Sequence, residues 1–398
     1  MEISEQLTSI VSRVLKIDDM TTGNDEDRYL IRYRGTLLGD SLTLYDQLAN
    51  SLRPYKLTPL FRKQVGKDAI LLVQSPSEPK PSNGWINLAL FIITLFSMVF
   101  GYAFFYGDLS LLFGEKITIT ALYESLESGV IFAISMLAIL LAHEFGHYFA
   151  ARYHKTNVTL PYFIPLPLSP LGTMGAFIRL KEPPKNKRSL LDIGITGPLA
   201  GLIVAIPILI LGLSLSEVQV IDVQPGYSVI MEGNSIFYLL SKFVVFGQIL
   251  PEPSSYIGLN PILYWVRYFF TGQPFPMGGL DVIIHPVAWA GWAGLLVTAL
   301  NLIPAGQLDG GHVIFTLVGK KARLLWPIIL AALILLGFVW YGWWIWAALI
   351  FLLGRVYAEP LDQITELDLN RRLLAMLGLA IFVLVFTPVP LMVSATGA

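Results

Sequence analysis

His143, Glu144 and His147 have the side-chain types and the spacing to hold a metal ion and to use it. Residues four apart on a helix lie on nearly the same face, so the imidazoles of His143 and His147 can reach one ion. Glu144 projects about a third of a turn away, which suits a general base that contacts a metal-bound water without being a ligand. The pattern His-Glu-x-x-His therefore predicts metal-assisted hydrolysis.

Asp309 is the third ligand that this pattern requires. Catalytic zinc takes three protein ligands and a water, and two neutral imidazoles leave the ion with its full charge. Residues 301–312 break an apolar stretch with Pro304 and several glycines, and the break presents Asp309. One carboxylate ligand together with ionised Glu144 brings the cluster to about neutral. Because the chain has no cysteine, we predict one Zn²⁺ per chain, held by the two histidines and Asp309.

These polar groups lie in a chain with the composition of a membrane protein. Hydrophobic residues make up 55% and charged residues 14%, against roughly 25% charged in soluble domains. A charged group at the centre of a bilayer costs roughly 2.5–3.5 kcal/mol, so a polar cluster there indicates function more than simple helix packing. We predict a polytopic α-helical membrane protein with about seven spans. The predicted spans are 85–105, 129–150, 192–215, 287–304, 323–340, 341–355 and 372–392.

Basic residues orient these spans. The connection 151–191 carries seven Lys or Arg residues, whereas 106–128 carries only Lys116. By the positive-inside rule the first connection is cytosolic and the second is external. Both metal-binding motifs then fall at cytosolic ends of their spans.

The N-terminal part has the pattern of a small soluble α+β domain over residues 1–74. A Pro/Ser linker follows at 75–84, and the transmembrane domain is expected at 85–398, with its metalloprotease core at about 129–315. The acidic first residues lack the basic region of a signal peptide, so we expect a cytosolic N-terminus. Helices are predicted at 5–15 and 41–52, and strands at 29–33, 57–62 and 68–73.

The segment 160–171 is apolar but contains four prolines, which exclude a regular helix. Irregular backbone at membrane depth is tolerated only beside protein or a wet cavity, so we predict a re-entrant or β-hairpin segment. The β-type stretch Gly175, Ala176, Phe177 and Ile178 follows. It would bind an unwound substrate by strand addition, although a hairpin that only packs is an open alternative.

Taken together, these motifs resemble one known family. "HEFGH", "NLIPAGQLDGG", "GTMGAFIRL" and "GITGPLAG" are similar to the site-2 protease family of intramembrane zinc metalloproteases. The flanking regions resemble its plastid and cyanobacterial branch, the ethylene-dependent gravitropism-deficient and yellow-green (EGY-like) proteins. Residues 35–39, Gly-Thr-Leu-Leu-Gly, depart from that branch's Gly-Asn-Leu-Arg-Gly motif. The resemblance implies zinc on His143, His147 and Asp309, water activation by Glu144, and a substrate or oxyanion contact from Asn301.

We therefore predict an intramembrane zinc metalloprotease that hydrolyses transmembrane protein substrates near the cytosolic side. An ion- or proton-coupled transporter and a proteolytically inactive membrane scaffold are the alternatives. The expected partners are transmembrane substrates and the lipid bilayer, with no nucleic acid. The N-terminal domain is expected to bind a regulator or a substrate, and the resemblance implies a cell inner membrane or a thylakoid membrane.

Several further segments have simpler interpretations. We favour a helix-end contact for His312 over a place behind the metal ligands, and we expect His154 to be solvated. The apolar patches 236–246 and 262–270 are too short to span and are expected on the outer surface. Apolar residues at helical spacing in 359–372 predict an amphipathic helix on the inner surface.

Overall fold

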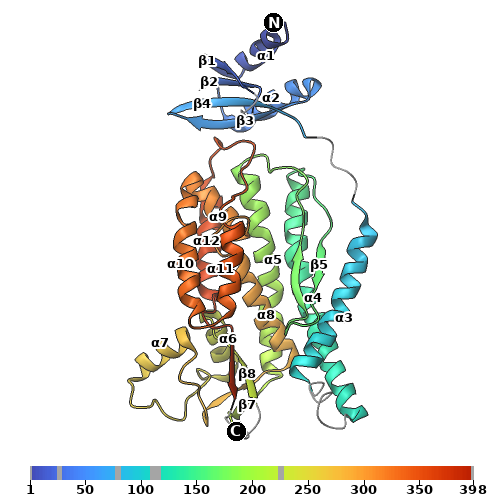
Figure 1. Ribbon diagram of the computed structural model, residues 1–398, viewed down its shortest axis with the longest axis vertical. Coiled ribbons are helices and arrows are strands. Elements are labelled where there is room, and N and C mark those ends of the chain that lie inside the picture. The colour runs from blue at the N-terminus through green and yellow to red at the C-terminus, as the bar shows by residue number, and fades with distance from the viewer. Residues whose placement is uncertain (1, 25–28, 77–81, 108–117, 223–227, 396–398) are drawn as a thin grey trace.

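The structure is a computed structural model that describes residues 2–24, 29–76, 82–107, 118–222 and 228–395. A bundle of helices forms its main body, and a small sheet-containing unit covers one end (Figure 1). Among the described residues, three helices are long and apolar enough to cross a membrane: α3 (Gly84–Tyr106), α4 (Ile119–Tyr153) and α5 (Lys187–Ser214).

Four further helices coincide with the other predicted spans. They are shorter, with 12 residues each in α10 and α11, 16 in α8 and 17 in α12. A 12-residue helix rises about 18 Å, less than the roughly 30 Å of a hydrocarbon core. A total of about seven crossings therefore remains a prediction. The bounds are α8 (Pro286–Asn301), α10 (Trp326–Gly337), α11 (Gly342–Leu353) and α12 (Leu369–Val385).

Glycines allow α5 to pack closely against α4 and α8. A Cβ on Gly146 of α4 would lie 2.6 Å from the Thr196 carbonyl oxygen, and one on Gly291 of α8 would lie 2.5 Å from the Leu209 Cα. Small residues at such positions let helix backbones approach one another in membrane bundles. Helices α4, α5 and α8 thus form one compact scaffold.

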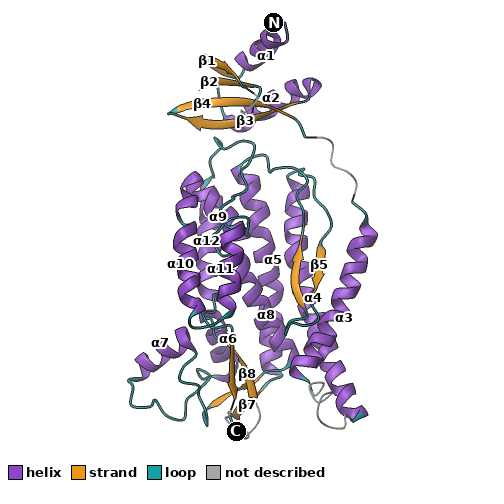
Figure 2. Cartoon of the chain, in the orientation of Figure 1, coloured by secondary structure: helices purple, strands orange, loops and turns teal. Residues whose placement is uncertain are grey.

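The Pro-rich segment forms an antiparallel hairpin of β5 (Tyr162–Pro165) and β6 (Thr173–Phe177). It lies beside the helices and not at an end of the bundle (Figure 2). Side chains of α3 satisfy its backbone, since the Asn87 amide donates to the Leu160 and Pro161 carbonyls and the Ser97 hydroxyl donates to that of Gly172. The predicted hairpin is confirmed, while its entry into a bilayer stays a prediction.

Residues 2–24 and 29–76 form the N-terminal unit, which has an antiparallel sheet in the order β1-β2-β4-β3 and an apolar core. The predicted helix at 41–52 is present as α2. Strand β1 is absent from our sequence prediction, because a register shift between Ile17 and Asp19 breaks its alternation of apolar and polar side chains. Asp18 and Asp19 pair with Lys67 and Arg34. The elements are α1 (Glu2–Ser12), β1 (Leu15–Thr22), β2 (Ile31–Leu37), α2 (Ser41–Leu52), β3 (Leu57–Gln64) and β4 (Lys67–Gln74).

The predicted amphipathic helix at 359–372 is wrong. Residue 362 forms isolated bridges to Phe61 and Asn186, and α12 begins only at Leu369. The Asp362 carboxylate accepts the amides of Ile364 and Thr365. Such side-chain bonds give the backbone an alternative to a helix, which the apolar spacing alone does not reveal.

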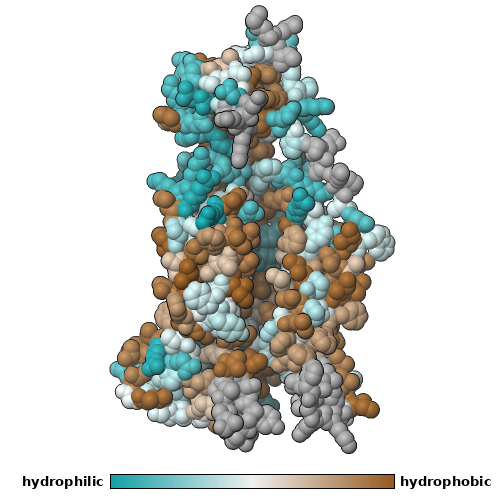
Figure 3. Space-filling view, viewed as in Figure 1, coloured by the Kyte–Doolittle hydropathy of each residue, from teal (hydrophilic) through white to brown (hydrophobic). Residues whose placement is uncertain are grey.

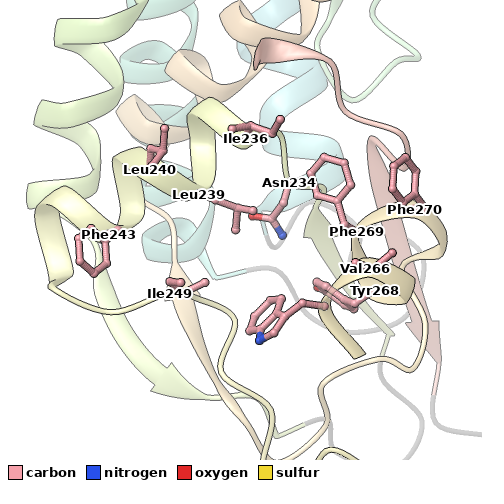
Figure 4. A pocket seen from close by; sticks show the side chains of 11 residues that line it. Asn234, Ile236, Leu239, Leu240, Phe243, Ile249, Val266, Tyr268, Phe269 and Phe270 are labelled. Carbon is pink, nitrogen blue, oxygen red and sulfur yellow. The ribbon is translucent and has the colours of Figure 1, made fainter. Parts of the chain in front are cut away.

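The other end of the bundle carries two short sheets and two short helices. Helices α6 (Ile236–Phe246) and α7 (Pro261–Thr271) match the predicted apolar patches. Both helices line an open cavity of about 680 Å³ that is almost wholly apolar (Figure 4). The paired strands are β8 (Ser228–Glu232) with β10 (Leu391–Ala395), and β7 (Glu217–Val220) with β9 (Leu280–Ile283).

The surface divides by polarity along the long axis. Apolar surface predominates over the helical bundle, and hydrophilic surface gathers on the N-terminal unit and the adjoining end of the bundle (Figure 3). The apolar surface of the helical bundle is the part that lipid would cover.

Candidate metal centre

Helix α4 places His143, Glu144 and His147 in its last third, toward the N-terminal unit. Their side chains are buried, with residue exposures of 3%, 4% and 7% respectively. The helix continues to Tyr153, so the three residues keep regular helical geometry and the two imidazoles lie on one face.

A tight loop after α8 brings Asp309 to these imidazoles. Gly306 adopts a left-handed conformation, and a Cβ there would lie 2.6 Å from the Gly354 Cα. A Cβ on Gly310 would lie 2.0 Å from the Leu302 carbonyl oxygen, so the loop folds back on the end of α8. Helix α9 (Asp309–Val318) then begins with the aspartate itself.

The three donor atoms form a nearly equilateral triangle. His143 Nε2 and His147 Nε2 are 3.2 Å apart, and Asp309 Oδ2 lies 3.4 Å and 3.3 Å from them. Tetrahedral zinc with bonds of about 2.0–2.1 Å places its ligand atoms about 3.3 Å apart. The residues therefore fit a zinc ion without rearrangement.

Helix α5 fixes the orientation of His147. The His147 Nδ1 lies 2.6 Å from the Ile193 carbonyl oxygen. Because a carbonyl only accepts, Nδ1 carries the proton and Nε2 keeps its lone pair for a metal. A Cβ on Gly197 would lie 2.1 Å from that Nε2, and one on Gly201 would lie 3.2 Å from His143 Nδ1. The two glycines provide the space in which the imidazoles sit.

A cavity of about 250 Å³ opens beside the triangle. Glu144 lines it, and the buried Oε2 of this carboxylate has no hydrogen-bond partner among the described residues. Of the other predicted site residues, Asn301, Ala176, Phe177 and Ile178 line the cavity, whereas Gly175 does not. Within the described chain β6 pairs only with β5, so its second edge remains free to face this cavity.

Two histidines differ from their predicted environments. His312 lines the cavity, and its buried Nδ1 has no partner within the described residues, so the favoured helix-end contact is wrong. Gly194 provides its space, since a Cβ there would lie 2.9 Å from the His312 Cβ. His154 is not simply solvated but lies 2.9 Å from an Asp192 carboxylate oxygen. For His312 the sequence signal was its position three residues after Asp309, because residues three apart share a helix face.

Gln307 also lines the cavity and was not predicted as a site residue. It lies in the irregular loop between α8 and α9. Helical or strand periodicity gives no signal for the direction of a side chain in such a loop.

Comparisons with known proteins agree with this arrangement. Residues 131–337, more than half of the chain, match the model of peptidase family M50. The chain is 30% identical over 342 residues to probable zinc metalloprotease EGY1, chloroplastic, of Oryza sativa subsp. japonica, covering 81% of this chain and 53% of that protein. It is 28% identical over 381 residues to probable zinc metalloprotease EGY2, chloroplastic, of Oryza sativa subsp. indica, covering 90% and 62%.

A third relative is probable zinc metalloprotease EGY1, chloroplastic, of Arabidopsis thaliana, 28% identical over 341 residues, or 80% of this chain and 56% of its own length. The chain thus spans between 53% and 62% of the length of these three relatives. No solved structure matches this chain.

Proposed function

The chain belongs to peptidase family M50, the site-2 protease family, and from that premise we propose that it is an intramembrane zinc metalloprotease. The proposed reaction is hydrolysis of peptide bonds in transmembrane proteins, near the cytosolic side. The observation that carries this proposal is the triangle of His143, His147 and Asp309 donor atoms, which has the dimensions of a tetrahedral zinc site.

The chemistry needs a Lewis acid, a base and a source of the nucleophile. When bound, zinc polarises the scissile carbonyl and lowers the pKa of a coordinated water toward roughly 7. Glu144 accepts the proton of the attacking water and delivers it to the departing amine, so that the peptide C–N bond breaks as a carboxylate and an amine form. Asn301 supports the reaction with a hydrogen bond to the substrate carbonyl oxygen.

The free edge of β6 supports a role in holding the substrate. A transmembrane helix hides its peptide bonds, so it must unwind before cleavage, and its freed N–H and C=O groups then need partners. Ala176, Phe177 and Ile178 border the cavity beside the metal triangle. We assign to this edge the pairing with an extended substrate by strand addition, with Gly175 extending the paired stretch.

We also propose a multi-pass arrangement with the N-terminal unit in the cytosol and the active site at the same end of the bundle. The charge asymmetry of the connections supports it. The relatives named chloroplastic favour a thylakoid membrane or a cell inner membrane as its location.

Metal content and cleavage of a model transmembrane substrate test the proposal. We expect one zinc per chain in both the wild type and the Glu144→Gln variant, with cleavage only by the wild type. Cleavage by the variant would remove Glu144 from its role. Zinc without cleavage by either form would favour a scaffold, and zinc-independent ion flux through reconstituted protein would favour a transporter.

A further inference from the structure

Residues 361–363, here called the bridging strand, join the N-terminal unit to the helical bundle. The Phe61 amide of β3 donates to the Leu361 carbonyl, and the Gln363 amide donates to the Phe61 carbonyl, both at 3.0 Å. On the opposite side the amides of Leu361 and Asp362 donate to the carbonyls of Pro184 and Lys185, at 3.0 and 2.8 Å. Residues 361–363 therefore bridge the edge strand β3 and the segment that precedes α5.

Side chains hold the bridging strand in place on the N-terminal unit. Leu361 and Ile364 pack against the apolar core of the unit. The Thr365 hydroxyl lies 2.7 Å from the Ser41 hydroxyl in a buried contact, and the Arg62 guanidinium donates to the Leu361 carbonyl at 2.7 Å. Asp362 is fully buried, and its carboxylate accepts the amides of Ile364 and Thr365.

The other side of the bridging strand leads directly to the metal site. The residue after Lys185 is Asn186, whose side chain caps α5 by accepting the Ser189 amide at 3.0 Å. Two helical turns further along α5, the Ile193 carbonyl holds His147 Nδ1 at 2.6 Å. Backbone hydrogen bonds thus connect β3 and the bridging strand to the segment before α5, and α5 itself leads to the carbonyl that contacts His147.

We propose that the outer edge of β3 is a docking surface for an extended peptide, filled here by the bridging strand, and that this docking keeps α5 positioned to orient His147. We expect docking to favour metal binding, because the structure contains both the docked N-terminal unit and an assembled triangle of donor atoms.

A matched pair of variants tests the backbone contact. Gln363→Pro removes the amide that donates to Phe61, whereas Gln363→Ala keeps it, and both lose the same side-chain bond to Glu359. We expect faster hydrogen exchange in the first turns of α5 and zinc affinity weaker by about tenfold in Gln363→Pro only, since loss of a group that orients a metal ligand costs roughly 10–100-fold. Arg62→Ala, which leaves the backbone of the bridging strand unchanged, should shift both readouts in the same direction.

A reversible disulfide crosslink tests whether restoring the docked contact also restores zinc affinity. The chain has no cysteine, and the contacting Ser41 and Thr365 hydroxyls give a short path for a disulfide. In the Gln363→Pro background, the oxidised Ser41→Cys/Thr365→Cys double variant should recover slow exchange and zinc affinity, and reduction should abolish the recovery. Gln363→Pro matching Gln363→Ala in both readouts, or an oxidised crosslink that weakens zinc binding, would overturn the inference.

The zinc-affinity readout rests on the proposed function, and failure of that function can be distinguished from failure of this inference. A wild type that binds no zinc contradicts the proposed function, while hydrogen exchange in α5 still tests the docking. A wild type that binds zinc and cleaves, with all docking variants behaving alike, contradicts only the inference drawn from the bridging strand.

Discussion

Two buried charged clusters lie at opposite ends of the bundle, and they satisfy their charges in different ways. At the end of the bundle away from the N-terminal unit, here called the outer end for its position in the molecule, the fully buried Lys242 lies 3.3 Å from Asp281, and the Tyr238 hydroxyl donates to Glu232 at 2.7 Å. This outer cluster contains two carboxylates and its own cation. The metal cluster also contains two carboxylates, Asp309 and Glu144, but its other members are histidines.

The difference shows what distinguishes a structural cluster from a site. Lys242 compensates the carboxylates of the outer cluster with a protein group, which ties α6 to β9 and needs no ligand. The metal cluster has the same number of carboxylates and no lysine or arginine among the described residues that line its cavity. Buried carboxylates without a cation are costly, and a divalent metal ion would supply the missing charge.

The largest effect is expected from Asp309→Ala. This change removes the only anionic ligand of the triangle and leaves two imidazoles, which are too few for a catalytic zinc site. Zinc content should fall from one per chain to near zero, with complete loss of cleavage. Asp281→Asn is the control change in the outer cluster. The zinc content of this variant, measured on folded protein, should stay at one per chain.

The outer cluster should respond to loss of its cation by losing stability. Lys242→Met leaves Asp281 buried and unpaired, and breaking a buried ion pair costs about 3–5 kcal/mol. The double variant Lys242→Met/Asp281→Leu should recover much of the free energy of unfolding, because both charges are then gone. Equal free energies of unfolding of the single and double variants in denaturant titrations would show that Lys242 does not compensate the charge of Asp281. Zinc content should be unchanged in both.

Gly197→Ala tests whether space at the metal cluster is as important as charge. The new Cβ would lie 2.1 Å from His147 Nε2, so the imidazole must move away from the shared ion. We expect zinc affinity to fall by about 10–100-fold. Gly201→Ala, where the contact to His143 would be 3.2 Å, should have a smaller effect. The order of the two affinities, measured by competition with a chelator, checks the geometry.

The smallest effect concerns the pH dependence of the outer cluster. Burial raises the pKa of Glu232 from 4.5 to about 7. A carboxyl with a raised folded pKa binds its proton more tightly in the folded state, so its contribution to stability is full below about pH 4.5 and is lost as the pH rises toward 7. The slope is at most about 1.4 kcal/mol per pH unit. Glu232→Gln should flatten this part of the melting-temperature profile, and an unchanged profile would contradict the assignment.

Local patterns predicted the elements whose causes are local. The helix at 41–52 and the hairpin after Leu160 follow from short-range periodicity and from proline positions. Strand β1 was missed because a register shift between Ile17 and Asp19 breaks its alternation. The 359–372 segment was misread because its hydrogen-bond partners lie in β3 and before α5. Neither cause is visible within a short window of sequence.

For the site, the sequence by itself determined which atoms can bind a metal and how much charge they supply. His143 and His147 share a helix face through a four-residue step, and the need for an anionic ligand pointed to Asp309. Only the tertiary structure decided that the three donor atoms lie 3.2–3.4 Å apart and that Ile193 and Gly197 of α5 orient His147 and make room for it. Helical periodicity acts over a few residues, whereas distances between separate helices are set by the packing of α4, α5 and α8.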